Sequence, residues 1–240
     1  MTTRSTPLAA PPRPAAAPPG AHLSHLSRVL ALGAVAGPAV FTLAWLVLGF
    51  VSSGYTVSGT HIAPYSHVSQ PISGLGMGGT APFMNTGFVL SGLLLLAGVI
   101  GIFQGITAAG RPVARWVSTV LLALSPAGLV VVGLFDLESP ALHFTGAGLI
   151  YLLPVISFPV AGHYLRRIPQ WRRFGTALFL AGALTLALAV VFTMTFDVDT
   201  TAAGHGVAGL TQRVLFTEVL AWFAAMGWLA RREPAARRDA

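Results

Sequence analysis

The sequence predicts an all-α integral membrane protein, a bundle of six transmembrane helices with both termini in the cytoplasm. Of its 240 residues, 54% are hydrophobic and only 9% are charged, whereas roughly 25% of the residues of a soluble globular protein are charged. The apolar residues gather in six segments, each near or above the roughly 20 residues needed to cross a bilayer. The basic residues lie almost entirely on one side of these segments. The composition therefore excludes a water-soluble single domain.

Each apolar segment is expected to be a helix, because only helices and closed barrels satisfy the backbone hydrogen bonds inside a bilayer. The segments cover residues 29–51, 83–106, 113–135, 141–165, 174–196 and 207–230. Small residues such as Gly33, Gly37 and Gly101 have a spacing that lets two helices approach closely. Pro154 and Pro159 both lie in the fourth segment, so this span is expected to bend most.

The two ends of the chain are predicted to be cytoplasmic tails. Residues 1–27 hold six prolines among alanines, and because such a composition cannot bury a core, this segment is expected to be disordered. The apolar segment that follows has a full bilayer width, which favours a retained anchor over a cleaved secretory signal. The membrane domain is then residues 28–231, and residues 232–240 form a short basic tail. The chain has no cysteine, which excludes disulfides and thiolate metal sites.

All 14 basic residues are arginine, and their positions predict the orientation. Threading six spans places 13 of the 14 on one side and leaves only Arg213 on the other, so the positive-inside rule puts both termini in the cytoplasm. Arginine without lysine in an alanine-rich chain is typical of a GC-rich bacterial gene. We therefore expect a multi-pass protein of the bacterial cytoplasmic membrane, with membrane lipids as partners. Nucleic acid is not expected as a partner, because the arginines flank spans, where they meet lipid headgroups.

The longest connection, residues 52–82, lies on the predicted outer side and has no carboxylate, lysine or arginine. It contains His67, Ser69 and Ser73 together with six glycines. Two interpretations are open for such a long loop. It either folds back over the helix bundle as a functional element or is a flexible polar linker.

The other two outer connections share a sequence pattern. In each, Phe-Asp-x-acid is followed by a histidine, and the polar members are Asp136, Glu138, His143, Asp197, Asp199 and His205. The two hairpins are either a weak parallel repeat, as in membrane proteins whose sites lie between repeats, or a chance similarity.

Carboxylate and imidazole groups suit zinc or another divalent cation, which makes Asp136, His143, Asp199 and His205 candidate metal ligands. The tight spacing of helical metal motifs, such as two histidines four residues apart, does not occur in this sequence. In the alternative interpretation, the acids end helices in solvent and the histidines lie at the headgroup level. Haem is not expected, because His143 and His163 lie at opposite ends of one span.

Arg213 and Glu218 are the two ionisable residues that the topology leaves unexplained. Glu218 lies more than one turn inside an apolar run, where a charged group normally faces the bundle interior and has a partner. Five residues apart, the two do not share a helix face. We therefore expect Arg213 to pair with Asp136 or Asp197 of a neighbouring hairpin, either as a structural ion pair or as part of a site.

Three stretches of the chain resemble a known family. They are Ser-Gln-Pro-Ile-Ser-Gly-Leu-Gly from Ser69, Gly-Leu-Phe-Asp ending at Asp136 with His143 beyond it, and Gly-Leu-Thr-Gln-Arg ending at Arg213 and running into Trp222. Together they resemble the six-span bacterial family catalogued as domain of unknown function 998, over nearly the whole chain after the tail. The resemblance implies a multi-pass membrane protein without an assigned activity. In that family the turn after the third span is often Gly-x-Phe-Pro, and here Asp136 replaces the proline.

Three functions remain open, and the sequence does not decide whether the protein is an enzyme. The first is a bundle that binds or moves a lipid or small molecule through an outward-facing polar pocket. The second is a metal-dependent lipid hydrolase that uses Ser69 or Ser73 with Asp136, His143 and His205. It resembles the seven-span ceramidase-type hydrolases, although the last span lacks their paired histidines. The third is a structural or assembly subunit.

Overall fold

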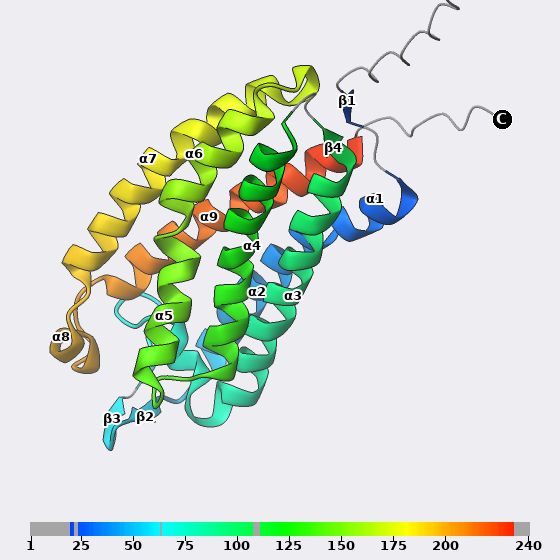
Figure 1. The fold of residues 1–240 in the computed structure, drawn as a ribbon. Coiled ribbons are helices and arrows are strands. Elements are labelled where there is room, and N and C mark those ends of the chain that lie inside the picture. Colours follow the sequence, from blue (N-terminus) through cyan, green and yellow to red (C-terminus); the bar gives the residue numbers. More distant parts are fainter. Residues whose placement is uncertain (1–19, 22–23, 63, 108–110, 233–240) are drawn as a thin grey trace, which may run out of the picture.

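The structure is a computed structural model and describes residues 20–21, 24–62, 64–107 and 111–232. It is a bundle of long helices (Figure 1) with six candidate membrane spans, as the sequence predicts. The spans are His25–Val51, Gly78–Gly105, Pro112–Leu134, Pro140–Leu165, Pro169–Thr195 and Ala208–Arg232. The predicted tails, residues 1–27 and 232–240, lie outside the described residues except for 20–21, 24–27 and 232.

The helices, in chain order, are α1 (His25–Ala31), α2 (Gly33–Val51), α3 (Ala81–Gly105), α4 (Pro112–Leu134), α5 (Pro140–Tyr151), α6 (Pro154–Leu165), α7 (Arg172–Thr195), α8 (Val198–Ala202) and α9 (Ala208–Arg232). Short 3₁₀ helices cover Ile72–Gly76, Gly78–Thr80 and Pro169–Trp171. Four short strands form two antiparallel pairs, β1 (Gly20–Ala21) with β4 (Ile106–Thr107) and β2 (Tyr55–Val57) with β3 (Thr60–Ile62).

Two of the spans, the first and the fourth, consist of two α-helices each. The fourth span breaks directly before Pro154, which has no N–H to continue the helical ladder, and the N–H groups of Leu152 and Leu153 both donate to the Gly148 carbonyl, at 2.9 and 3.3 Å. This break is the bend that the sequence predicts. The first span breaks at Leu32, where the sequence has no proline.

The first span begins at His25 rather than at residue 29, because the Ser24 hydroxyl accepts a hydrogen bond from the Ser27 N–H at 3.1 Å and so caps α1. Small residues then let α1 and α2 lie against α3. A Cβ at Gly98 would collide with the backbone of Ala34, and Ser91 donates to the Gly37 carbonyl at 2.7 Å. The close approach of the first two spans that the glycines predict is confirmed.

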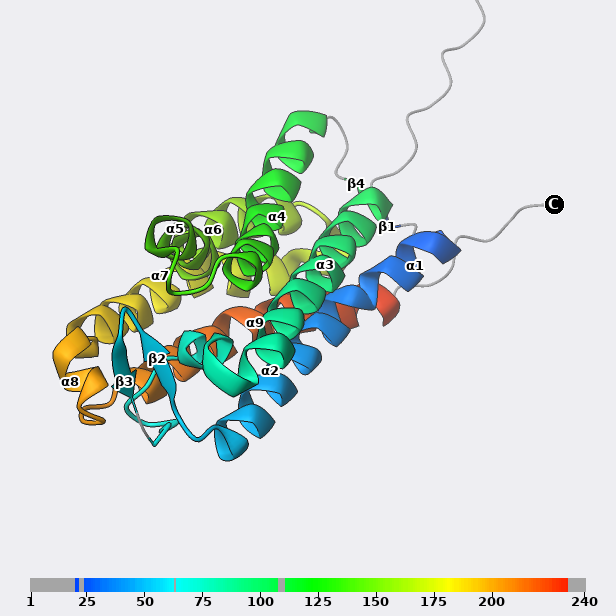
Figure 2. The ribbon, with the colours of Figure 1, turned by 90° about the horizontal axis from the view of Figure 1, so that it is seen from below.

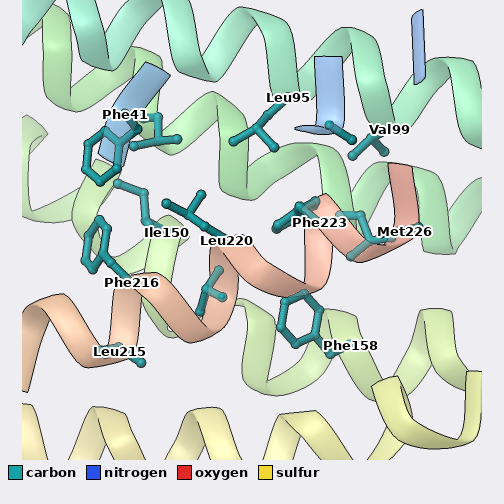
Figure 3. Close-up of a cluster of buried hydrophobic side chains, with 14 of the residues drawn as sticks. Phe41, Leu95, Val99, Ile150, Phe158, Leu215, Phe216, Leu220, Phe223 and Met226 are labelled. Carbon is teal, nitrogen blue, oxygen red and sulfur yellow. The ribbon is translucent and has the colours of Figure 1, made fainter. Parts of the chain in front are cut away.

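Helix α9 runs through the middle of the bundle and carries much of the core (Figure 3). Phe216 packs against Phe41 of α2, with ring centroids 5.8 Å apart, and Phe223 packs against Phe158 of α6 at the same distance. The face of α9 that is turned to these helices holds polar side chains away from lipid, whereas Leu210, Val214 and Trp228 of the same helix are exposed. This placement decides the surroundings of Arg213 and Glu218.

The two ends of the bundle differ in charge. Nine arginines lie at one end, which we call the arginine end: Arg28, Arg111, Arg115, Arg166, Arg167, Arg172, Arg173, Arg231 and Arg232. The opposite end, which we call the loop end, carries the loop of residues 52–82, the connection from α4 to α5, and α8. Figure 2 shows β2, β3 and α8 gathered at the loop end, with β1 and β4 at the arginine end.

Candidate functional site

At the loop end, the loop of residues 52–82 is folded onto the bundle rather than extended as a linker. Its β2–β3 hairpin and two 3₁₀ helices give it regular structure, and many of its side chains are buried, including Tyr55, Tyr65 and Leu75. The loop is joined to the start of α9 by a backbone hydrogen bond from Leu210 N–H to the Val68 carbonyl at 2.9 Å. The structure therefore supports a loop that folds back over the helix bundle and contradicts a flexible linker.

Arg213 holds the loop against α9. Its guanidinium is buried and donates from Nη1 to the carbonyls of His67 at 2.8 Å and Gln70 at 3.0 Å. Nη1 also donates to the Gly209 carbonyl at 2.8 Å, and Nη2 donates to the hydroxyl of Tyr65. One planar fork thus ties four groups together, which a lysine could not do.

The residues beside Arg213 complete this contact. Gln212 accepts a hydrogen bond from the Ile72 N–H at 2.7 Å, and a Cβ at Gly209 would collide with the Gln70 carbonyl. The segment 209–213 therefore lies directly against the segment 69–76. These are two of the stretches that carry the family resemblance, so the structure gives them a shared packing role.

Aromatic rings surround the Arg213 guanidinium and the His67 ring. The guanidinium lies over the ring of Trp45, 5.1 Å from its centroid, and His67 Nε2 donates to the Leu46 carbonyl at 3.4 Å. Burial lowers the pKa of His67, and the Arg213 charge lowers it further. Burial raises the pKa of Tyr65, although Arg213 opposes this, and burial beside Tyr65 raises the pKa of Tyr55 to about 12.

The predicted ion pair of Arg213 with Asp136 or Asp197 is wrong. All the hydrogen bonds of the guanidinium go to main-chain carbonyls and a tyrosine hydroxyl. Asp136 Oδ1 accepts from the Glu138 N–H at 3.0 Å, and Asp197 Oδ1 accepts from the Thr200 N–H at 2.8 Å. The physical reason is that carbonyls of a folded loop reach the buried guanidinium, whereas both aspartates are used in their own turns.

Three of the four acids of the two hairpins, Asp136, Glu138 and Asp197, accept hydrogen bonds from main-chain N–H groups. Asp197 caps α8, and its hydrogen bonds with Thr200 lower the pKa of the exposed Asp197 carboxyl. Glu138 Oε1 accepts from the Ser58 N–H at 2.8 Å and so joins the α4–α5 connection to the loop. This favours the interpretation in which these acids end helices and turns.

The candidate metal ligands do not meet. Within the described residues, no group of three or more His, Asp or Glu side chains is placed to hold a metal ion. His143 is buried and donates from Nδ1 to the Phe135 carbonyl at 2.9 Å, whereas His205 is exposed. The convergence of Asp136, His143, Asp199 and His205 on one ion, which this candidate site would require, is therefore absent from the described residues.

The two candidate nucleophiles lie in the docked loop. Ser69 is buried, and its hydroxyl has no hydrogen-bond partner within the described residues. Ser73 is half-buried on the first 3₁₀ helix of the loop. No hydrogen bond of the described residues joins either serine side chain to His143 or His205. This arrangement lacks the contact between nucleophile and base that a hydrolase needs.

Glu218 lies inside the membrane span formed by α9, and it is bonded to two neutral side chains. Its Oε1 accepts from Trp222 Nε1 at 2.7 Å, one turn along α9. Its Oε2 lies 3.0 Å from Thr185 Oγ1 of α7. Thr185 Oγ1 lies equally close, 3.0 Å, to the Ala181 carbonyl, so one hydroxyl hydrogen faces two acceptors. The sequence predicts a partner for this intramembrane carboxylate, and the structure gives it two, Thr185 and Trp222.

A cavity of about 640 Å³ lies at the arginine end, between α4, α6 and α7. Its walls are mostly apolar and include Val117 of α4, Pro159 of α6 and Phe179 of α7. Val117 is 44% exposed and Phe179 is 39% exposed, so the cavity opens sideways on the surface that lipid would cover. Arg111 and His163 also line it.

A smaller cavity of about 250 Å³ lies at the loop end, between the end of α2 and the start of α3. Ser52, Ser53 and Thr80 contribute its polar lining. The predicted outward-facing polar pocket would lie at this end. The larger cavity, at the arginine end, was not predicted from the sequence.

From the sequence, the arginines around this larger cavity were interpreted only as markers of topology, and their contacts with His163 were not predicted. His163, Arg166 and Arg167 are three and four residues apart, the spacing that brings side chains together on a helix. Arg166 Nη2 lies 2.9 Å from His163 Nδ1, and Arg167 Nη2 lies 3.4 Å from His163 Nε2. This spacing is visible in the sequence and could have predicted that the three side chains lie together.

Comparison with known proteins identifies one family. The model of the family described as Protein of unknown function (DUF998) matches residues 35–229, which include all of the loop end and all the residues that line both cavities. No curated protein and no solved structure shows significant similarity to the chain.

Proposed function

The chain belongs to the DUF998 family of proteins of unknown function, and we propose that this multi-pass membrane protein binds a membrane lipid, with an acyl chain in the cavity between α4, α6 and α7. The cavity is the observation that carries the proposal. Its volume of about 640 Å³ falls in the usual range of ligand pockets, about 300–1,000 Å³. Its exposed apolar rim faces the surface that lipid covers.

The alternatives have less support from the geometry. A hydrolase needs a nucleophile beside a base or a metal, and the described residues hold neither arrangement. The smaller cavity at the loop end supports the outward-facing pocket less well, because about 250 Å³ is below the range for ligand pockets, about 300–1,000 Å³. A purely structural subunit would have no need of an open cavity on its lipid-facing surface.

The distribution of arginines supports an orientation for this binding site. Nine arginines of the described residues lie at the arginine end, and positive residues favour the cytoplasmic side. The site would then meet the cytoplasmic leaflet. The arginine-only composition supports the bacterial cytoplasmic membrane as its location.

The test is to fill the cavity and measure bound lipid. Val117→Trp places a large side chain in the cavity, whereas Val120→Trp places it on the same helix at an exposed position outside the lining. Native mass spectrometry of detergent-purified protein should show copurified lipid on the wild type and on Val120→Trp, but not on Val117→Trp. Equal lipid on all three proteins would overturn the proposal, as would the absence of lipid from the wild type under conditions that keep it folded.

A further inference from the structure

Three arginines and a histidine surround the mouth of the cavity between α4, α6 and α7. Arg111 and His163 line the cavity, and Arg166 and Arg167 directly follow α6. The Arg166 guanidinium lies over the ring of Phe179, 5.0 Å from its centroid, and Phe179 is itself part of the wall. The positive groups are therefore concentrated at one edge of an otherwise apolar space.

The contacts inside this cluster leave hydrogen-bond donors in excess. Both ring nitrogens of His163 face a guanidinium, Nδ1 facing Arg166 and Nε2 facing Arg167. A neutral imidazole has one nitrogen that accepts and one that carries a hydrogen. One of the two contacts therefore brings a donor against a donor, which an anion between them would relieve.

No acidic side chain of the described residues supplies that anion. Four of the five acids described lie at the loop end: Asp136, Glu138, Asp197 and Asp199. The fifth, Glu218, is bonded to Thr185 and Trp222 inside the bundle. The guanidinium groups near His163 are thus without a carboxylate partner in the part of the chain that the structure describes.

The chemistry of the ligand follows from these two observations. Arginine binds phosphate through paired, charge-assisted hydrogen bonds. An acyl chain gains little by moving from a bilayer into an apolar cavity, because lipid tails are as apolar as the side chains that line it. Selection among lipids must therefore come from the headgroup.

We propose that Arg111, Arg166, Arg167 and His163 form a binding site for the phosphate of an anionic lipid whose acyl chain occupies the cavity. This inference rests on the proposed function and names the lipid class. The apolar walls favour a lipid over a soluble anion, because a free phosphate would use the basic mouth alone. Basic pockets between spans on the cytoplasmic side bind lipid headgroups in this manner.

The experiment compares two lipids that share their acyl chains and the phosphodiester but differ in the headgroup alcohol, so that one is anionic and the other is zwitterionic. Binding of phosphatidylglycerol and of phosphatidylcholine with the same acyl chains is measured by native mass spectrometry on the full chain in neutral detergent. Each arginine beside an anionic lipid surface contributes about fivefold in affinity. The double variant Arg166→Gln, Arg167→Gln should therefore bind phosphatidylglycerol roughly twenty-five-fold more weakly, with phosphatidylcholine binding much less affected because its choline cation offsets the phosphate charge.

The matched control is the double variant Arg172→Gln, Arg173→Gln, which removes two arginines from the same end that do not line the cavity and that, unlike Arg166 and Arg167, make no hydrogen bond to His163 in the described residues. It should keep the preference for phosphatidylglycerol. A single Arg111→Gln variant should weaken binding by about fivefold, so the test does not depend on the folding of one double variant.

Each outcome decides a different point. Equal binding of the two lipids by the wild type would overturn the headgroup assignment and leave the proposed lipid binding in place. Equal losses in both double variants would assign the preference to general surface charge and overturn the site. Full displacement of phosphatidylglycerol by inorganic phosphate would assign the site to a soluble anion. If every variant, including Val117→Trp, keeps its bound lipid, the proposed function itself is wrong.

Discussion

Replacing Arg213 with methionine should release the loop of residues 52–82 from the bundle and leave the helices in place. The side chain is only 6% exposed, and methionine keeps its apolar stem out to the position of Nε. What is lost is the guanidinium fork. Three of its hydrogen bonds join α9 to the loop, at the His67 and Gln70 carbonyls and the Tyr65 hydroxyl.

The size of the effect follows from these contacts. A hydrogen bond contributes about 1 kcal/mol net, so the three bonds give about 3 kcal/mol, and the contact of the guanidinium with the ring of Tyr65, 5.9 Å from its centroid, adds about 0.5–1 kcal/mol. The free energy needed to open the loop should therefore fall by about 3–4 kcal/mol. Since about 1.4 kcal/mol is a factor of ten, exchange of the loop amides should become at least a hundredfold faster.

The assay is hydrogen–deuterium exchange followed by mass spectrometry, with peptides from the loop compared with peptides from α3 and α4. Arg213→Lys should give an intermediate effect, because a single ammonium group cannot reach both carbonyls and the tyrosine hydroxyl together. Arg111→Gln, at the arginine end, is the control and should leave loop exchange unchanged. Unchanged exchange in Arg213→Met would refute the reasoning, and so would equal acceleration in every helix, which would make Arg213 a support of the whole fold.

Three further predictions concern other parts of the bundle. Burial and Arg213 hold the pKa of His67 below its usual 6.5, so the docked loop favours the neutral ring. The stabilisation that the neutral ring gives to the docked loop is complete above pH 6.5. It is lost as the pH falls through the lowered pKa that His67 has in the folded protein. Loop exchange, corrected for intrinsic rates, should rise on acidification in the wild type and less in His67→Gln. Glu218→Gln keeps an acceptor for Trp222 Nε1 and offers a donor to the threonine oxygen, so its thermal stability should match the wild type, whereas Glu218→Leu should lose about 1–3 kcal/mol. Gly98→Ala should destabilise the bundle by about 1–3 kcal/mol through overpacking, whereas Gly148→Ala, where a Cβ meets nothing within 4 Å, should be neutral or stabilising.

Each of these predictions has an outcome that contradicts it. The same acid sensitivity in wild type and His67→Gln would place the titrating group elsewhere. A Glu218→Gln protein as unstable as Glu218→Leu would show that the negative charge, and not the pair of hydrogen bonds, is what the site requires. Equal melting temperatures for the two glycine variants would show that α2 and α3 do not pack as closely as the structure has them.

The spans and their order could be predicted from the sequence because each depends on local composition. A run of apolar residues must become a helix in lipid, whatever surrounds it. The break before Pro154 was predictable for the same reason, since the missing N–H is a property of the residue itself. The break at Leu32 was not predictable in this way, because no proline marks it in the sequence.

The partners of the buried polar groups could not be predicted from residue types. Arg213 stood out as an isolated cation, and a carboxylate was the obvious partner to expect. Its acceptors are instead backbone carbonyls of a folded loop, which every residue has and no sequence pattern marks. The same holds for Glu218, whose threonine partner lies on a different helix.

By itself, the sequence determined a six-span helical membrane protein with one basic end and two ionisable residues out of place. The hydropathy and charge of each segment determine how that segment interacts with the bilayer, whatever the rest of the fold, so both can be interpreted directly from the sequence. The tertiary structure decided where polar groups meet and where space is left: the loop closes over one end through Arg213, and α4, α6 and α7 leave a cavity beside His163 at the other. Both features depend on the distances between helices, which are decided by the packing of side chains far apart in the sequence.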